Sequence, residues 1–137
     1  MAADDSRFAT SGINVGLFCS TPSVPVSRNL GRKQAMELLL TGHFIDAHTA
    51  LQWGLVNRVV SASRLDQEVA ELAGSIMSKS WVAVATGKRM FYKQLELPLE
   101  SAYDYASGVM AGNMMADDVE EGVDAFMQKR TPVWKHQ

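Results

Sequence analysis

The side chains able to perform nucleophilic chemistry are few and widely separated in this sequence. The single cysteine, Cys19, could act as a nucleophile with His43 or His48 as its base, but nothing in the sequence places them together. Apart from Arg28, the neighbouring residues offer no cation that would activate the thiol. We therefore predict that Cys19 is a buried structural cysteine.

Metal and nucleotide sites are not expected either. His43 and His48 are five positions apart, whereas spacing of i, i+4 places two imidazole rings on one face of a helix. The lone cysteine and three scattered histidines do not have zinc-finger or zinc-ribbon spacing. The glycines lack the spacing of a dinucleotide fingerprint or a phosphate-binding loop, so no cofactor is predicted.

Four carboxylates cluster at positions 117–121: Asp117, Asp118, Glu120 and Glu121. Paired carboxylates can serve as a general acid and a general base. At the start of a helix, however, they also stabilise the exposed amide dipoles, and we interpret them as a solvated face. Three methionines, at 110, 114 and 115, are interpreted as core filler or an oligomer contact rather than as an adaptable binding surface.

The elements that position these residues are predicted to be mostly helices. Apolar residues recur at i, i+3, i+4 spacing, which predicts helices over 31–40, 46–53, 63–77, 82–94, 98–114 and 117–130. Alternating apolar residues over 13–17 and an apolar run over 55–60 suggest short strands. Two prolines within 21–26 predict a loop there, because proline disrupts helix interiors and paired strands.

Composition limits the classes of function. The 137 residues are 47% hydrophobic and 20% charged, which is typical of a folded globular chain. The net charge of −2, with both signs mixed along the chain, gives no basic face for nucleic acid. The apolar runs are far shorter than the roughly 20 residues of a membrane span. One cysteine indicates a reducing compartment, and the acidic first residues are unlike a secretory signal or a mitochondrial transit peptide.

Several short motifs occur in a familiar order: 2–10 (AADDSRFAT), 40–42 (LTG), 45–47 (IDA), 53–56 (WGLV), 121–122 (EG), 125–126 (AF) and 129–132 (KRTP). Together they resemble the enoyl-CoA hydratase (crotonase) family. The resemblance covers essentially the whole chain but only the C-terminal half of a family member. It implies an α/β crotonase fold, C-terminal portion, mostly helical with a few short strands. Residues 1–60 would close the β/α spiral, and residues 61–137 would form the C-terminal helical region for trimerisation and the lid.

The resemblance also indicates which catalytic groups this chain carries. Family hydratases use an oxyanion hole and two glutamates, and the oxyanion hole and one glutamate belong to the preceding half. The other glutamate matches Gly12, which has no side chain, and the usual glycine-rich loop reads Pro22–Val26 here. We therefore expect a truncated protein of acyl-CoA and fatty-acid metabolism without hydratase activity in this chain.

Alternatives to that interpretation stay open. The chain could be a non-catalytic module that docks onto crotonase subunits. A longer form could use the oxyanion hole alone for isomerisation, decarboxylation or thioester hydrolysis. For the isolated chain, the side chains of Leu38, Leu39 and Leu55 are expected at an exposed face.

The last helix carries the predicted contacts to CoA. Phe126 and Lys129 match the family pattern Ala-Phe-x-x-Lys-Arg, which implies that the ring contacts adenine and the ammonium contacts a phosphate. Alternatively, Phe126 continues an apolar stripe and Lys129 complements the end of the helix. The resemblance further implies acyl-CoA as ligand, a homo-oligomer such as a trimer, and a mitochondrial location. Nucleic acid is not an expected partner.

Overall fold

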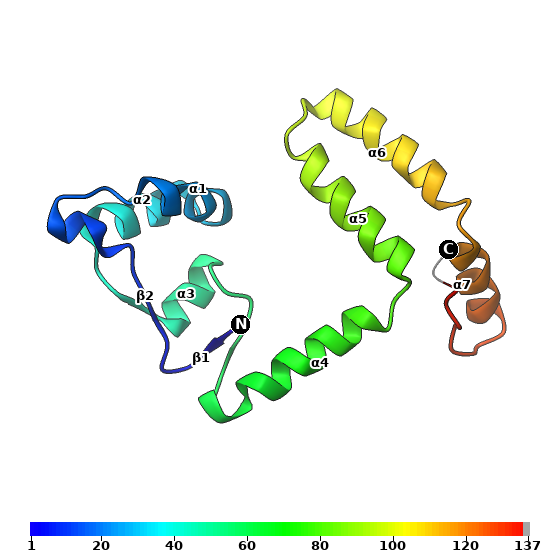
Figure 1. The fold of residues 1–137 in the computed structure, drawn as a ribbon, viewed down its shortest axis with the longest axis horizontal. Coiled ribbons are helices and arrows are strands. Elements are labelled where there is room, and N and C mark those ends of the chain that lie inside the picture. Colours follow the sequence, from blue (N-terminus) through cyan, green and yellow to red (C-terminus); the bar gives the residue numbers. More distant parts are fainter. Residues whose placement is uncertain (136–137) are drawn as a thin grey trace. The chain divides into compact units, whose positions relative to one another are not determined.

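The computed structural model describes residues 1–135. The chain is predominantly helical, and each of its strands is only two residues long (Figure 1). It divides into two compact units, residues 1–71 and 72 onward, and the division lies within α4 (Leu65–Met77). The prediction of a mostly helical chain with a few short strands is confirmed.

Two short strand pairs anchor the beginning of the first unit. β1 (Ala2–Ala3) is parallel to β4 (Val59–Val60), and β2 (Arg7–Phe8) is antiparallel to β3 (Ile45–Asp46). The apolar run at 55–60 therefore contributes a strand only at its last two residues. Strands this short gain their stability from the helices packed around them.

The helices α2 (Arg32–Thr41) and α3 (Ala47–Trp53) form where the sequence predicts them, and each is followed by a glycine cap. The glycines directly after them adopt left-handed φ values of 62° and 84°, which glycine tolerates without a steric cost. At the start of α3, the main-chain N–H of Thr49 donates to Asp46 Oδ1 over 2.7 Å. That hydrogen bond lowers the pKa of Asp46 below its ordinary value.

The hydrophobic core of the first unit lies against α2. Leu38 is only 3% exposed, and Leu39 is equally buried, so the expectation that both lie at an exposed face is wrong. Leu55 is half-buried rather than exposed. The apolar stripe of α2 is covered within its own unit by residues from α1, β3 and the α3 end: Leu30, Val26, Ile45, Trp53 and Leu55.

The segment before α2 differs from its prediction in two ways. Residues Ser11–Val15 form a 3-10 helix rather than a strand, and Ser20–Asn29 form helix α1 rather than a loop. Helix α1 accommodates Pro22 because the N–H groups of the first helical turn have no intrahelical acceptor, so the N–H that proline lacks is not missed there. Pro25 lies one turn further on, so it removes only one hydrogen bond near the helix start.

The second unit is built from helices. α5 (Trp81–Gln94) and α6 (Leu99–Asn113) form a hairpin, and α7 (Asp117–Met127) follows (Figure 1). These helices confirm the predicted ranges to within a few residues, except that α7 ends before Lys129. Ser80 Oγ caps α5 by accepting the N–H of Ala83 over 3.2 Å.

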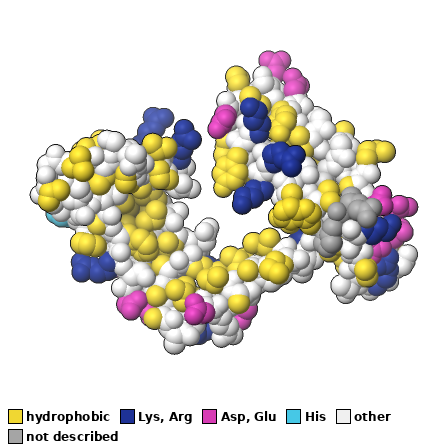
Figure 2. Space-filling view, viewed as in Figure 1, with side chains coloured by type: hydrophobic (Ala, Val, Ile, Leu, Met, Phe, Trp, Pro, Cys, Tyr) yellow, Lys and Arg dark blue, Asp and Glu magenta, His cyan; other side chains and the backbone are white. Residues whose placement is uncertain are grey.

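Large apolar side chains are exposed on each of the two units, and Figure 2 shows hydrophobic side chains at the surface of both. The three methionines at 110, 114 and 115 are among them, so they are not core filler within this chain. A contact between subunits at these methionines stays a prediction. Within residues 1–135, no helix has both the length and the apolar character that crossing a bilayer requires.

Candidate functional site

Helix α7 packs through a face of small and acidic residues, and Val123 and Phe126 of its apolar stripe are exposed. Its buried positions are Asp118 and Ala125, which are 4% and 1% exposed, and Gly122 lies between them on the same face. The ring of Trp134 covers Gly122, and a Cβ at position 122 would meet ring carbons at 3.4 Å. Phe126, in contrast, is 82% exposed. Within the described residues, Phe126 is therefore not part of the core.

The residues after α7 form a tight left-handed cap. The N–H of Arg130 donates to the Ala125 carbonyl over 3.0 Å, and the N–H of Lys129 donates to the Phe126 carbonyl over 3.2 Å. This pair of hydrogen bonds is the Schellman pattern, whose central residue must be left-handed. Lys129 occupies that position with φ of 54°, and it is the one non-glycine residue of positive φ among residues 1–135.

A lysine in this conformation is unusual. A left-handed backbone places the Cβ of an L-residue close to the carbonyl oxygen, at a cost of roughly 1–2 kcal/mol. Glycine avoids that cost and is common at this helix position. The cap bonds compensate for the strain and leave the Lys129 side chain exposed at the end of α7.

A carboxylate on α7 fixes the chain that follows the cap. Glu121 receives two hydrogen bonds from the Arg130 guanidinium, of 2.6 Å and 2.9 Å, and a third from the N–H of Val133 over 2.7 Å. The hydrogen bonds from Arg130, and then the one from Val133, lower the pKa of Glu121 to about 2. Arg130 is therefore held back against α7, and its cation is already paired.

A second carboxylate, Asp118, ties the tail to the start of α5. The hydroxyl of Ser80 donates to Asp118 Oδ2 over 2.5 Å, and the main-chain N–H of Lys135 donates to Oδ1 over 2.7 Å. Beside them, the indole N–H of Trp134 donates to the Ser78 carbonyl over 2.8 Å. The prediction that residues 117–121 form a solvated face is therefore wrong for Asp118, which is a buried acceptor.

Gly12, which the resemblance predicts to stand where the family has a glutamate, lies in the first unit. A Cβ built on Gly12 would lie 2.7 Å from the carbonyl oxygen of Leu17 and 2.8 Å from Cys19 Sγ. The N–H of Leu17 donates to the Gly12 carbonyl over 3.0 Å, which closes the backbone around this position. No side chain fits there without a shift of the loop.

Cys19 is half-buried, so the prediction of a buried structural cysteine is corrected. Its sulfur lies in the space that a side chain at position 12 would need. Among residues 1–135, no three His, Cys, Asp or Glu side chains form a group suited to a metal ion.

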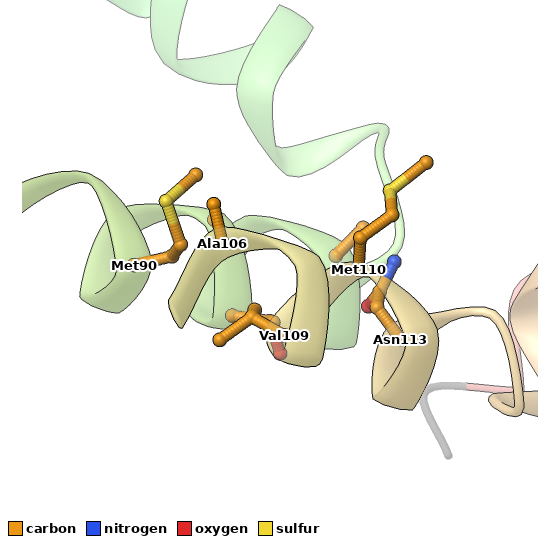
Figure 3. A pocket seen from close by; sticks show the side chains of 8 residues that line it. Met90, Ala106, Val109, Met110 and Asn113 are labelled. Atoms are coloured by element: carbon orange, nitrogen blue, oxygen red, sulfur yellow. The ribbon is translucent and has the colours of Figure 1, made fainter. Parts of the chain in front are cut away.

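An apolar groove lies between α5 and α6, with a volume of about 280 Å³ (Figure 3). Met90 of α5 and Ala106, Val109 and Met110 of α6 line it, with Asn113 at one end. Asn113 Oδ1 is buried without a hydrogen-bond partner in the part of the chain that the structure describes.

Of the residues predicted to bind CoA, Phe126 is exposed near the end of α7, and Lys129 is exposed in the cap that follows it. The residues that shape this end, Asp118, Glu121 and Trp134, were not identified as such from the sequence. The Glu121–Gly122 pair belongs to the family motif, but residues 128–135 give these two residues their roles by folding back along α7.

The sequence model of the protein family described as enoyl-CoA hydratase/isomerase matches residues 1–137. The chain belongs to the enoyl-CoA hydratase/isomerase family. The family expectation is thus confirmed along the whole sequence.

Two relatives illustrate the extent of the match. Enoyl-CoA hydratase domain-containing protein 3, mitochondrial, from Rattus norvegicus is 49% identical over 136 residues, covering 99% of this chain and 45% of that protein. Carnitinyl-CoA dehydratase from Salmonella typhi is 40% identical over 140 residues, covering 98% of this chain and 54% of that protein. The chain spans about half the length of these family members.

Solved structures of the family confirm the fold. An enoyl-CoA hydratase from Mycobacterium smegmatis is 54% identical with a TM-score of 0.93, over 96% of this chain and 51% of that one. Human enoyl Coenzyme A hydratase domain-containing protein 3 is 48% identical with a TM-score of 0.92, over 96% and 52%. The chain has the fold of a crotonase portion.

Proposed function

We propose that this chain provides part of an acyl-CoA-binding surface, with Phe126 contacting the adenine ring and Lys129 contacting a phosphate. The observation that carries this proposal is the arrangement at the end of α7. Phe126 and Lys129 are both exposed and three positions apart. The cap hydrogen bonds of Lys129 and Arg130 fix the backbone that joins them. An aromatic ring and an ammonium offer stacking and a charge-assisted hydrogen bond, which suit a phosphorylated adenosine.

The other cations near this end support the assignment to Lys129. Arg130 is engaged by Glu121, and Lys135 Nζ lies 3.6 Å from Asp117 Oδ2. Within residues 1–135, Lys129 has no carboxylate within ion-pair distance. Its charge is therefore available to an anionic ligand, whereas the charge of Arg130 is already partly neutralised.

The test is a calorimetric titration of CoA into the wild type and the Lys129→Ala variant. Lys135→Ala is the matched control, because it removes an exposed cation from the same tail and leaves the main-chain N–H of residue 135 in place. We expect CoA affinity to fall in Lys129→Ala and to stay nearly constant in Lys135→Ala. Equal affinities of wild type and Lys129→Ala would show that Lys129 is only a helix-end charge.

We also propose that the chain does not hydrate trans-2-enoyl-CoA. At Gly12 there is no carboxylate to activate water, and the Leu17 carbonyl and Cys19 Sγ fill the space that one would need. We expect no turnover of a short trans-2-enoyl-CoA above buffer and heat-inactivated controls. Gly12→Glu should not create activity, because the loop has no room for the side chain. Clear turnover by the wild type would refute the proposal.

Exposed apolar side chains favour a second role, docking onto other crotonase-family subunits or onto copies of this chain. Trp81, Leu99, Tyr103 and Met115 are all more than half exposed. Apolar surface of this extent is typical of a surface that another protein covers. Light scattering of the purified chain should therefore give a mass above that of a monomer, and a trimer is the expected state. A sharp monomer peak with a cooperative unfolding transition would contradict this role.

A mitochondrial location is proposed from the relatives. The matching proteins of rat and human carry "mitochondrial" in their names. Acyl-CoA and fatty-acid metabolism in that compartment agrees with the proposed ligand. Cell fractionation with antibody detection of the endogenous protein tests this, and recovery outside the mitochondrial fraction would contradict it.

A further inference from the structure

We infer that Glu121 is a positioning residue for CoA binding: it holds Arg130 and the chain after α7 so that Lys129 keeps its left-handed conformation and presents its ammonium to phosphate. The inference rests on the proposed function, because it assigns a role at the same surface. It adds a residue that contacts no ligand and acts through its neighbours.

The geometry behind the inference starts at the cap. Lys129 is followed directly by Arg130, whose N–H donates to the Ala125 carbonyl and whose guanidinium forms two hydrogen bonds to Glu121. The main chain of Arg130 and its side chain are thus both fixed to α7. The strained residue between α7 and Arg130 has little freedom to relax to an ordinary φ.

Glu121 also fixes the main chain three residues after Arg130, at Val133. Its Oε1 accepts the N–H of Val133 over 2.7 Å in addition to its bond with Arg130. One carboxylate therefore fixes residues on both sides of Thr131 and Pro132. A strained backbone conformation persists where the surrounding structure determines it in this way.

The same contact separates the roles of two adjacent cations. A guanidinium with a bidentate carboxylate partner is a poorer phosphate ligand, because its donors are occupied and its charge is balanced. The Lys129 ammonium then remains as the cation that meets the ligand. Without Glu121, Arg130 would be released beside it.

This arrangement gives a prediction whose sign differs from that of simple electrostatics. Glu121→Gln removes a negative charge and frees the Arg130 cation, so Coulomb attraction alone would tighten the binding of anionic CoA. If Glu121 positions Lys129, however, its loss weakens the binding of CoA. We expect CoA affinity to fall at least about twofold, which corresponds to the lower end of the coupling between residues that share partners.

Glu120→Gln is the matched control. It is the same substitution one position earlier on α7, at an exposed residue that has no ion pair within residues 1–135. We expect CoA affinity in Glu120→Gln to stay at the wild-type value or to rise slightly. A fall in Glu121→Gln alone therefore reports position rather than net charge.

A double-mutant cycle with Lys129→Ala shows whether Glu121 acts through Lys129. If it does, Glu121→Gln weakens CoA binding in the wild type but has little effect in the Lys129→Ala background. A residue with a merely structural role would lower affinity by the same factor in both. Melting temperatures, measured alongside, ensure that each titration is performed on folded protein.

Amide hydrogen exchange provides a readout that needs no ligand. The N–H groups of Lys129 and Arg130 should exchange faster in Glu121→Gln than in Glu120→Gln, because their cap bonds open more often. Unchanged exchange, or CoA binding that is equal or tighter in Glu121→Gln, overturns the inference. Failure of the wild type to bind CoA overturns the proposed function, and exchange at Lys129 then still decides whether Glu121 fixes this residue.

Discussion

Replacing Lys129 with glycine and, separately, with alanine divides its conformational effect from its chemical effect. Both variants remove the ammonium, so they share any loss of CoA contact and of interaction with the helix end. They differ in backbone freedom: alanine keeps the Cβ that is strained at φ of 54°, and glycine does not.

The magnitude follows from that difference. Relief of left-handed strain contributes roughly 1–2 kcal/mol to the glycine variant. The greater freedom of glycine in the unfolded chain offsets about 0.4–1 kcal/mol of this gain. We therefore expect Lys129→Gly to be more stable than Lys129→Ala by about 1 kcal/mol, which corresponds to roughly 3 °C in melting temperature for a chain of this size.

CoA affinity should behave differently from stability. A charge-assisted hydrogen bond to phosphate contributes roughly 1.5–3 kcal/mol, so both variants should bind CoA about ten- to a hundredfold more weakly than the wild type. Raised salt should reproduce part of this loss in the wild type and change the variants less.

Thermal unfolding and calorimetric titration of CoA, performed on the same preparations, measure the two effects. A glycine variant no more stable than the alanine variant would refute the argument from left-handed strain. Wild-type affinity in both variants would refute the contact between Lys129 and phosphate. The two arguments can thus fail independently.

Four further predictions concern other parts of the chain. The pKa of Glu121 is lowered from 4.5 to about 2, so its ionised form stabilises the folded chain above pH 4.5, and this stabilisation is lost as the pH falls through 2. Chemical denaturation should therefore give a difference in unfolding free energy between wild type and Glu121→Gln that is constant above about pH 5. Between about pH 5 and pH 2 this difference should shrink. Gly12→Ala should lower the free energy of unfolding by about 1–3 kcal/mol through overpacking, and an unchanged value would mean that the loop moves freely. Pro25→Ala should stabilise exposed helix α1 by about 1 kcal/mol, because it restores an N–H for the Thr21 carbonyl; a lower melting temperature would contradict this. Cys19 should react with a thiol reagent no faster than a small-molecule thiol at the same pH, since no described cation or base lies in hydrogen-bonding contact with it, and much faster labelling would contradict this.

Local sequence signals predicted the helices whose ends carry their own caps. Asp46 and the glycines after α2 and α3 act through neighbouring residues, so their effect can be read from a short window. Helix α1 was missed for the opposite reason. Two prolines argue against a helix, and only their placement in the first two turns makes one possible.

The candidate site could be predicted only in part. The i, i+3 spacing of Phe126 and Lys129 predicts one face of a helix, but α7 ends at Met127 and Lys129 lies in the left-handed cap, so a helical period does not extend to it. The roles of Asp118 and Glu121 depend on a tail that folds back along α7, and a periodic pattern carries no information about that fold. The apolar stripe through Val123 and Phe126 even indicated the wrong side of α7 as its packed face within this chain.

The contact of the tail with α7 affects how the C-terminus can be engineered. Trp134 covers Gly122, and the N–H of Lys135 satisfies a buried oxygen of Asp118. Removing residues 134 and 135 would therefore uncover a glycine and leave a carboxylate oxygen without one of its donors, although residues 131–135 have no regular secondary structure. Truncations of this chain should therefore stop after residue 135, so that both Trp134 and the N–H of Lys135 are kept.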